Sequence, residues 1–176
     1  MPPLGTGTAG KATQALRTAE AVDPHLDSSI LIAASDPGNI NHAAAVGYLK
    51  ANQPLGLSAS RRALREFLTK SPTRSGFRDL QKTYGIKLAR NIPTKQINAL
   101  VDRLQKAFTD GRVLRDGDAR IAAEAMLRSE TLATADLPFF KRAKDLGIDV
   151  EFVGSSGGAL SKAANYKPNP VTIPPP

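Results

Sequence analysis

The sequence contains no cysteine and no tryptophan, and its only histidines are His25 and His42. Without cysteine there can be no disulfide bond, thiol nucleophile, or cysteine-ligated zinc or iron–sulfur site. Two histidines are also too few for a three-histidine metal site. The longest apolar run, Ile30 to Ala34, is far shorter than the roughly 20 residues that span a bilayer. These absences predict a protein of a reducing compartment, active in the cytoplasm and not in a membrane.

The 176-residue chain is rich in positive charge, with a net charge of +8. Residues 58–115 carry 14 basic and 4 acidic side chains, whereas the rest of the chain carries 10 basic and 12 acidic ones. This asymmetry fits a polyanionic partner, because lysine and arginine displace counterions from phosphates. A well-solvated surface would explain the same charge equally well.

Composition divides the chain into three parts. Seven of the 13 prolines lie within residues 1–3 and 167–176. Residues 1–21 are predicted to be an N-terminal arm, part of which could be helical, and residues 22–153 form the body. The GSSGG stretch at 154–158 predicts a flexible joint, and the proline-rich segment from Tyr166 onward is expected to be extended.

Short apolar runs alternate with helical stripes along the body, a pattern typical of an α/β fold with a mostly parallel sheet. The first strand is predicted to end near Asp27. The other predicted strands are Leu55–Ser58, Ile86–Ala89, Thr131–Thr134 and Ile148–Val153. Helices are predicted over residues 39–51, 60–68 and 137–146, from Ser71-Pro72, from an N-cap at Thr94 to Gly111, and after an N-cap at Asp116 or Asp118.

Four carboxylates fall at predicted strand ends or helix starts: Asp27, Glu66, Asp118 and Asp136. Open parallel sheets bind ligands at the carboxyl ends of their strands, so these side chains are expected to converge. Three of them also have a purely structural explanation, Asp118 and Asp136 as helix caps and Glu66 as the partner of Arg62 four residues earlier. Asp27 is the hardest to explain in that way, because it interrupts an apolar stretch.

Four blocks of sequence resemble the PIN domain, the metal-dependent nuclease fold of many toxin–antitoxin ribonucleases. They are LDSSILI at 26–32, LS through LREFL at 57–68, DARIAAEA at 118–125 and LATADLPFF at 132–140. The last two blocks are the most specific. The resemblance implies a PIN-like fold with a central, mostly parallel sheet of about five strands flanked by helices.

The resemblance also implies a divalent-metal-dependent endoribonuclease of the toxin type. Asp27, Glu66, Asp118 and Asp136 are then the catalytic residues, and they hold one or two Mg²⁺ or Mn²⁺ ions directly or through water. Ser29 and Thr134 are expected to orient a carboxylate or a phosphate oxygen. The chemistry agrees, because crowded carboxylates repel one another and a hard cation with oxygen ligands relieves that repulsion.

RNA is the expected partner, and its backbone is expected to meet five arginines of the basic segment: Arg61, Arg62, Arg65, Arg74 and Arg78. The resemblance adds an antitoxin or immunity protein as a second partner, and pairing with another copy of the chain stays open. The chain could also be the toxin module of a larger protein that is delivered into a target-cell cytoplasm. The alternative function is a non-catalytic PIN-like module that binds nucleic acid, with its acids acting only as caps.

Two further patterns are interpreted as incidental. Residues 5–11, GTGTAGK, have the glycine and lysine spacing of a phosphate-binding P-loop. However, Ala12 stands where that loop needs serine or threonine, and no strand precedes it. His25 lies close enough to Asp27 to act as a base, but a packed or surface histidine is the expected role.

Overall fold

The computed structural model describes residues 23–70, 75–155 and 157–176. Within them five strands form a single all-parallel sheet in the order β3-β2-β1-β4-β5, as the α/β prediction required. The strands are β1 (Pro24–Leu26), β2 (Ser58–Ala59), β3 (Lys87–Leu88), β4 (Thr131–Thr134) and β5 (Val150–Phe152). The N-terminal arm with its P-loop-like stretch, and the helix start predicted at Ser71-Pro72, lie outside the described residues.

The strand order places the functional edge of the sheet. From β1 the chain moves outward to β2 and β3, then returns to β4 on the other side of β1. In a sheet of this kind the crossovers leave β1 and β4 toward opposite faces, which opens a crevice at their carboxyl ends. Residues that follow Leu26 and Thr134 therefore meet at that crevice.

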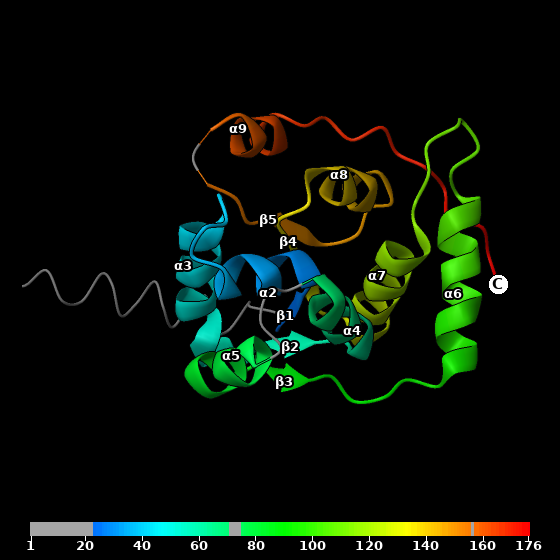
Figure 1. Ribbon diagram of the computed structural model, residues 1–176. Coiled ribbons are helices and arrows are strands. Elements are labelled where there is room, and N and C mark those ends of the chain that lie inside the picture. The colour runs from blue at the N-terminus through cyan, green and yellow to red at the C-terminus, as the bar shows by residue number, and fades with distance from the viewer. Residues whose placement is uncertain (1–22, 71–74, 156) are drawn as a thin grey trace, which may run out of the picture.

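Helices surround the sheet (Figure 1). They are α2 (Ser28–Ser35), α3 (His42–Asn52), α4 (Arg61–Lys70), α5 (Gly76–Tyr84), α6 (Thr94–Lys106), α7 (Asp116–Arg128), α8 (Leu137–Asp145) and α9 (Gly158–Ala164), with a short 3₁₀ turn η1 (Gln53–Leu55). Helix α2 packs against α3, α4 and α5, while α6 packs on α7, and α8 lies between β5 and α9. None of the helices in the described parts of the chain is long and apolar enough to cross a membrane.

The core is built around the two central strands. Leu26 of β1 and Leu132 of β4 are fully buried, together with Ile30 and Leu31 of α2. Helix α7 turns a face of buried alanines and Ile121 inward. Because alanine side chains are small, this face lets α7 approach the sheet closely, which brings the start of the helix to the crevice.

Several element boundaries differ from the sequence prediction. β2 begins at Ser58 instead of Leu55, because η1 takes up Gln53 to Leu55 with Pro54 in its first turn. Gly56 then reverses the chain with φ 88°, in the left-handed region. Helix α6 has Pro93 at its N-cap instead of Thr94, and it ends at Lys106, before Gly111.

The start of α7 also corrects the sequence prediction. The N-cap is Arg115, so neither Asp116 nor Asp118 caps the helix. Both aspartates lie inside the first turn, where a negative charge interacts favourably with the positive end of the helix dipole. Asp116 pairs with Arg120 at 3.0 Å on the surface, whereas Asp118 lies within electrostatic reach of Asp27.

The C-terminal part is packed against the body. No helix was predicted within residues 154–176, yet α9 occupies Gly158–Ala164. From Tyr166 the chain has no regular structure, as expected, and it runs from α9 past α8 to α6 (Figure 1). The amide of Val171 donates to the carbonyl of Asp145 at 2.9 Å, and Arg103 donates to the carbonyl of Pro174 at 2.6 Å.

Candidate active site

Asp27 lies at the centre of the crevice. It directly follows β1 and is the N-cap of α2, with its Oδ1 accepting from the amide of Ser28 at 2.8 Å. Its Oδ2 accepts from the hydroxyl of Ser29 at 2.5 Å and from the hydroxyl of Thr134 at 2.8 Å. The residue is only 3% exposed. Three hydrogen-bond donors therefore offset part of the cost of burying the Asp27 carboxylate away from solvent.

Ser29 and Thr134 join the ends of β1 and β4. The Ser29 hydroxyl accepts from the amide of Ala135 at 2.9 Å, and the Thr134 hydroxyl accepts from the amide of Asp136 at 3.0 Å. Each hydroxyl therefore directs its proton to Asp27 and its lone pair to the segment after β4. The two residues predicted to orient a carboxylate both contact Asp27.

Asp136 is the N-cap of α8, and its Oδ1 accepts from the amide of Phe139 at 3.0 Å. The capping role considered for it from the sequence is therefore present. Its other carboxylate oxygen, Oδ2, accepts no hydrogen bond from the described residues. One oxygen is thus fixed by the helix, and the second is available to a ligand.

Glu66 comes from α4, the helix that follows β2. Its Oε1 accepts from the Nε of Arg62 at 2.8 Å, which is the i,i+4 pair considered from the sequence. Its Oε2 accepts from the hydroxyl of Ser28 at 2.8 Å, so Glu66 is also joined to the first turn of α2. The side chain is therefore held at the crevice beside Asp27.

The pKa of Asp118 is affected by the three other acids of the candidate site. It is the third residue of α7, and its carboxylate accepts no hydrogen bond from the described residues. Burial, followed by the charges of Asp27, Asp136 and Glu66, raises the pKa of Asp118 to about 7, with Arg115 opposing the shift. The structure thus brings Asp27, Asp136 and Glu66 within electrostatic reach of Asp118.

Burial also raises the pKa of Asp27. The hydrogen bonds from Ser29, Thr134 and the Ser28 amide oppose that shift, and the nearby charge of Glu66 adds to it. The cost of burying the charged carboxylate therefore outweighs the hydrogen bonds that stabilise it.

The side chains at the crevice suit a hard divalent cation, because their ligating atoms are all oxygens. Two of the carboxylates, Asp118 and Asp136, also have oxygens that accept no hydrogen bond from the described residues. Within residues 23–70, 75–155 and 157–176, however, no three aspartate, glutamate or histidine side chains lie close enough together to hold one ion as they stand. The chemistry of the residues thus fits Mg²⁺ or Mn²⁺. Which of them would ligate it directly, and which through water, stays a prediction.

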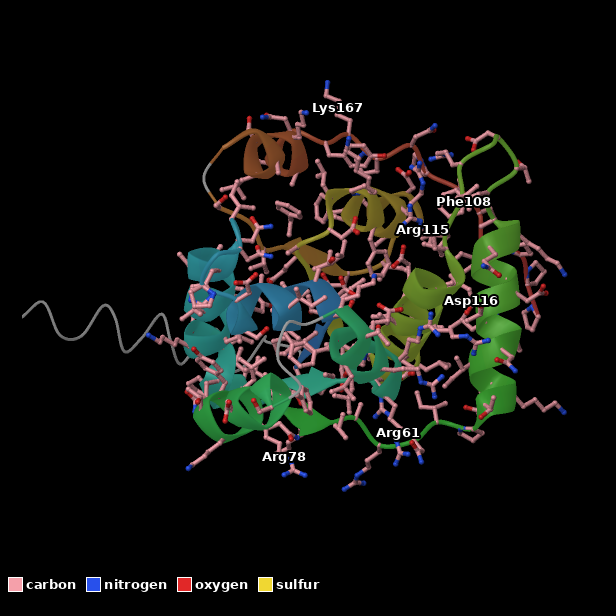
Figure 2. The ribbon with its side chains drawn as sticks, viewed as in Figure 1. Arg61, Arg78, Phe108, Arg115, Asp116 and Lys167 are labelled. Carbon is pink, nitrogen blue, oxygen red and sulfur yellow. The ribbon has the colours of Figure 1, made fainter. Side chains whose placement is uncertain are left out.

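The predicted arginines fall into three groups. Arg62 is engaged with Glu66, and Arg74 lies outside the described residues. Arg61, Arg65 and Arg78 are exposed and form no ion pair with the described part of the chain. Figure 2 shows Arg61 and Arg78 pointing outward along the same rim of the molecule. Arg61 begins α4 at the carboxyl end of β2, on the edge of the sheet where the acids lie.

His25 is packed, as expected from the sequence. It is fully buried, with its Nδ1 2.6 Å from Oε2 of Glu130, and the hydroxyl of Ser58 donates to the same oxygen at 2.9 Å. Two further residues that the sequence did not indicate, Ser28 and Gly117, lie against Glu66. A serine at the first helical position and a glycine inside a helix were the available signals.

No protein-family model matches the sequence, and no curated protein matches it either. The solved structures that resemble the fold include two with TM-scores above 0.5. One is the complex of VapBC2 from Rickettsia felis bound to a DNA fragment from their promoter, with a TM-score of 0.55 and 16% identity over 74% of this chain and 98% of that chain. The other is FitAcB from Neisseria gonorrhoeae, with a TM-score of 0.52 and 18% identity over 72% of this chain and 95% of that chain.

These likenesses support the PIN-like α/β fold that the sequence resemblance implied. The low identity limits this result to the fold. Activity depends on the residues at the crevice, because one fold serves many functions.

Proposed function

We propose that this protein is a divalent-metal-dependent endoribonuclease that hydrolyses RNA phosphodiester bonds, and that it is the toxin of a toxin–antitoxin pair. One observation carries the proposal: Asp27, Glu66, Asp118 and Asp136 gather at the carboxyl ends of β1 and β4, where their charges help to raise the pKa of Asp118 to about 7. Such crowding is unfavourable in a metal-free structural cluster and is expected of a cation site.

The residues at and around the crevice have different roles in this proposal. Bound at the crevice, a Mg²⁺ or Mn²⁺ ion would polarise the phosphate and activate the attacking water. Ser29 and Thr134 fix the orientation of the Asp27 carboxylate, and Asp118 supplies a carboxylate with no competing donor. Arg61, Arg65 and Arg78 are exposed positive charges that would attract the RNA backbone. The expected products end in a 3′-hydroxyl and a 5′-phosphate.

An antitoxin is the proposed protein partner. The likeness of the fold to the VapBC2 and FitAcB structures supports it, because both are toxin–antitoxin complexes. The toxin role predicts that expression of this chain alone arrests growth of a bacterial host, and that the Asp118→Asn variant does not.

The test is an RNA cleavage assay on the purified full chain. Total RNA should be cleaved in Mg²⁺ or Mn²⁺, should stay intact in EDTA, and should be cleaved again when Mn²⁺ is added in excess. Cleavage that persists in EDTA would contradict the metal dependence. Salt-dependent RNA binding without cleavage under any metal condition would instead support the non-catalytic binding module.

A further inference from the structure

Gly117 lies inside a helix, at a position where the backbone conformation does not require glycine. It lies in the first turn of α7, between Asp116 and Asp118. Its φ is not positive, so an L residue could adopt the same backbone conformation. Glycine is unfavourable in a helix relative to alanine, because it loses more backbone entropy on folding. The reason for glycine at this position must therefore be the space around it.

That space is occupied by the Glu66–Arg62 pair. A Cβ atom at position 117 would overlap Oε1 of Glu66 and would lie 3.0 Å from a terminal guanidinium nitrogen of Arg62. Real Cβ atoms do not approach oxygen so closely, so an alanine would force the carboxylate to move. Gly47, inside α3, has no neighbouring atom within 4 Å of the same position.

Glu66 is thus confined on three sides. The hydroxyl of Ser28 holds Oε2, the Nε of Arg62 holds Oε1, and the bare backbone of α7 at Gly117 closes the third side. Asp118 is the next residue along α7. Because Gly117 has no side chain, the Glu66 carboxylate can lie directly against α7, the helix that carries Asp118.

We infer that Gly117 is a positioning residue: by having no side chain, it sets where the Glu66 carboxylate lies in the acidic site, and thereby how tightly the site binds a divalent cation. The part that concerns the cation rests on the proposed function. The part that concerns the placement of Glu66 stands on the geometry alone.

The placement is tested without metal or RNA by comparing Gly117→Ala with Gly47→Ala. Both changes add one methyl group inside a helix, so they share the gain in helix propensity. In the wild-type chain and in G47A, the Nε–H of Arg62 should be a resolved NMR signal that exchanges slowly with solvent. In G117A its exchange should be faster by about tenfold or more, because its acceptor has moved. An unchanged Arg62 signal in G117A overturns the inference.

The consequence for the cation is tested by calorimetric titration with Mn²⁺. We expect G117A to weaken binding by about tenfold, the usual effect of disturbing a group that orients a ligand, and G47A to leave it unchanged. Glu66→Asp shortens the side chain and leaves room for the added methyl. The double variant E66D/G117A should therefore bind no more weakly than E66D alone.

Additive effects in the double variant would overturn the inference, because they would mean that the methyl group added at position 117 acts on a group other than Glu66. If the wild-type chain itself binds no Mn²⁺, the metal dependence in the proposed function fails. The Arg62 comparison then still decides whether Gly117 positions Glu66.

Discussion

The hydroxyl of Thr134 donates to Oδ2 of Asp27 at 2.8 Å, across 107 residues of sequence. Thr134 ends β4 and Asp27 follows β1, so this bond ties together the two strands on either side of the point where the strand order reverses. Both residues are buried. The bond therefore fixes one carboxylate of the candidate site and also joins the centre of the sheet.

Thr134→Val should destabilise the metal-free protein at neutral pH. Valine keeps the shape but removes a donor from a buried carboxylate, which costs about 1–3 kcal/mol. Thr131→Val on the same strand is the matched control, because the Thr131 hydroxyl bonds the exposed Asp149 and its removal should cost less than about 0.5 kcal/mol. Urea denaturation of the three proteins in EDTA measures the difference. Equal midpoints for the two variants would contradict the role given to Thr134.

Asp118 predicts a pH dependence of stability in the absence of metal. Its pKa is about 7 in the folded protein and near 3.8 when the chain is unfolded. The stability associated with this raised pKa is fully present below about pH 4 and is lost as the pH rises through about 7. Asp118→Asn removes this dependence, so the variant should exceed the wild type at pH 8 by about 1–2 kcal/mol, discounted for partial solvent exposure.

The control for that prediction is Asp116→Asn, which removes a neighbouring charge that pairs with Arg120 on the surface. It should change the stability by no more than about 1 kcal/mol at either pH. Thermal unfolding at about pH 4.5 and about pH 8 in EDTA is the measurement. An Asp118→Asn variant that is no more stable than the wild type at the higher pH would show that burial and the neighbouring acids do not raise the pKa of Asp118.

The hydrogen bonds of Asp145 predict that this residue holds the C-terminal segment against the body. This buried carboxylate accepts from the hydroxyl of Tyr166 at 2.6 Å, the amide of Asn169 at 2.9 Å and the guanidinium of Arg112 at 2.8 Å. Asp145→Asn should cost about 1–3 kcal/mol, because these buried contacts lose their ionised acceptor, while Arg112 keeps its ion pair with Asp110. Hydrogen exchange at Asn169 and Val171 should become faster, while Asp149→Asn leaves it unchanged. Continued protection of both amides would show that other contacts hold the segment.

The exposed arginines predict the salt dependence of RNA binding. Changing Arg61, Arg65 and Arg78 together to alanine should weaken binding and reduce the slope of log K against log salt by roughly 0.7 for each phosphate that is no longer neutralised. Arg62 is left in place because it holds Glu66. Fluorescence titration of a single-stranded RNA at several salt concentrations measures the slope.

The control carries three alanines in place of Lys50, Lys162 and Lys167, which are exposed elsewhere on the molecule. Figure 2 shows Lys167 at the opposite side from Arg61 and Arg78. Equal slopes for both triple variants would mean that the net charge alone attracts RNA and that the arginine rim is not its path.

Local sequence patterns were sufficient for much of the fold. Thr131–Thr134 was predicted with its observed bounds, because its apolar residues are flanked by polar ones at both ends. The short strands β2 and β3 were placed within a few residues, since two-residue strands leave almost no periodicity. The helix α9 was missed because glycines precede and begin it and because it packs on α8.

The candidate site was only partly predictable. The Arg62–Glu66 pair follows from an i,i+4 spacing, which any helix imposes. The contacts of Ser28 with Glu66 and of Thr134 with Asp27 depend on strand order, which brings together residues 38 and 107 positions apart. The role of Gly117 needs the approach of α4 to α7, which no local pattern encodes.

The most direct test of the account compares RNA cleavage by the wild type, Asp118→Asn and Asp116→Asn under the same Mn²⁺ concentration. Both variants remove one negative charge from the first turn of α7, but only Asp118 faces the other three acids. We expect the cleavage rate of Asp118→Asn to fall by at least about 100-fold, as expected when a metal-site carboxylate is removed, while Asp116→Asn stays close to the wild type. Cleavage by Asp118→Asn at the wild-type rate, or an equal decrease in both variants, would contradict a metal-dependent site at this crevice.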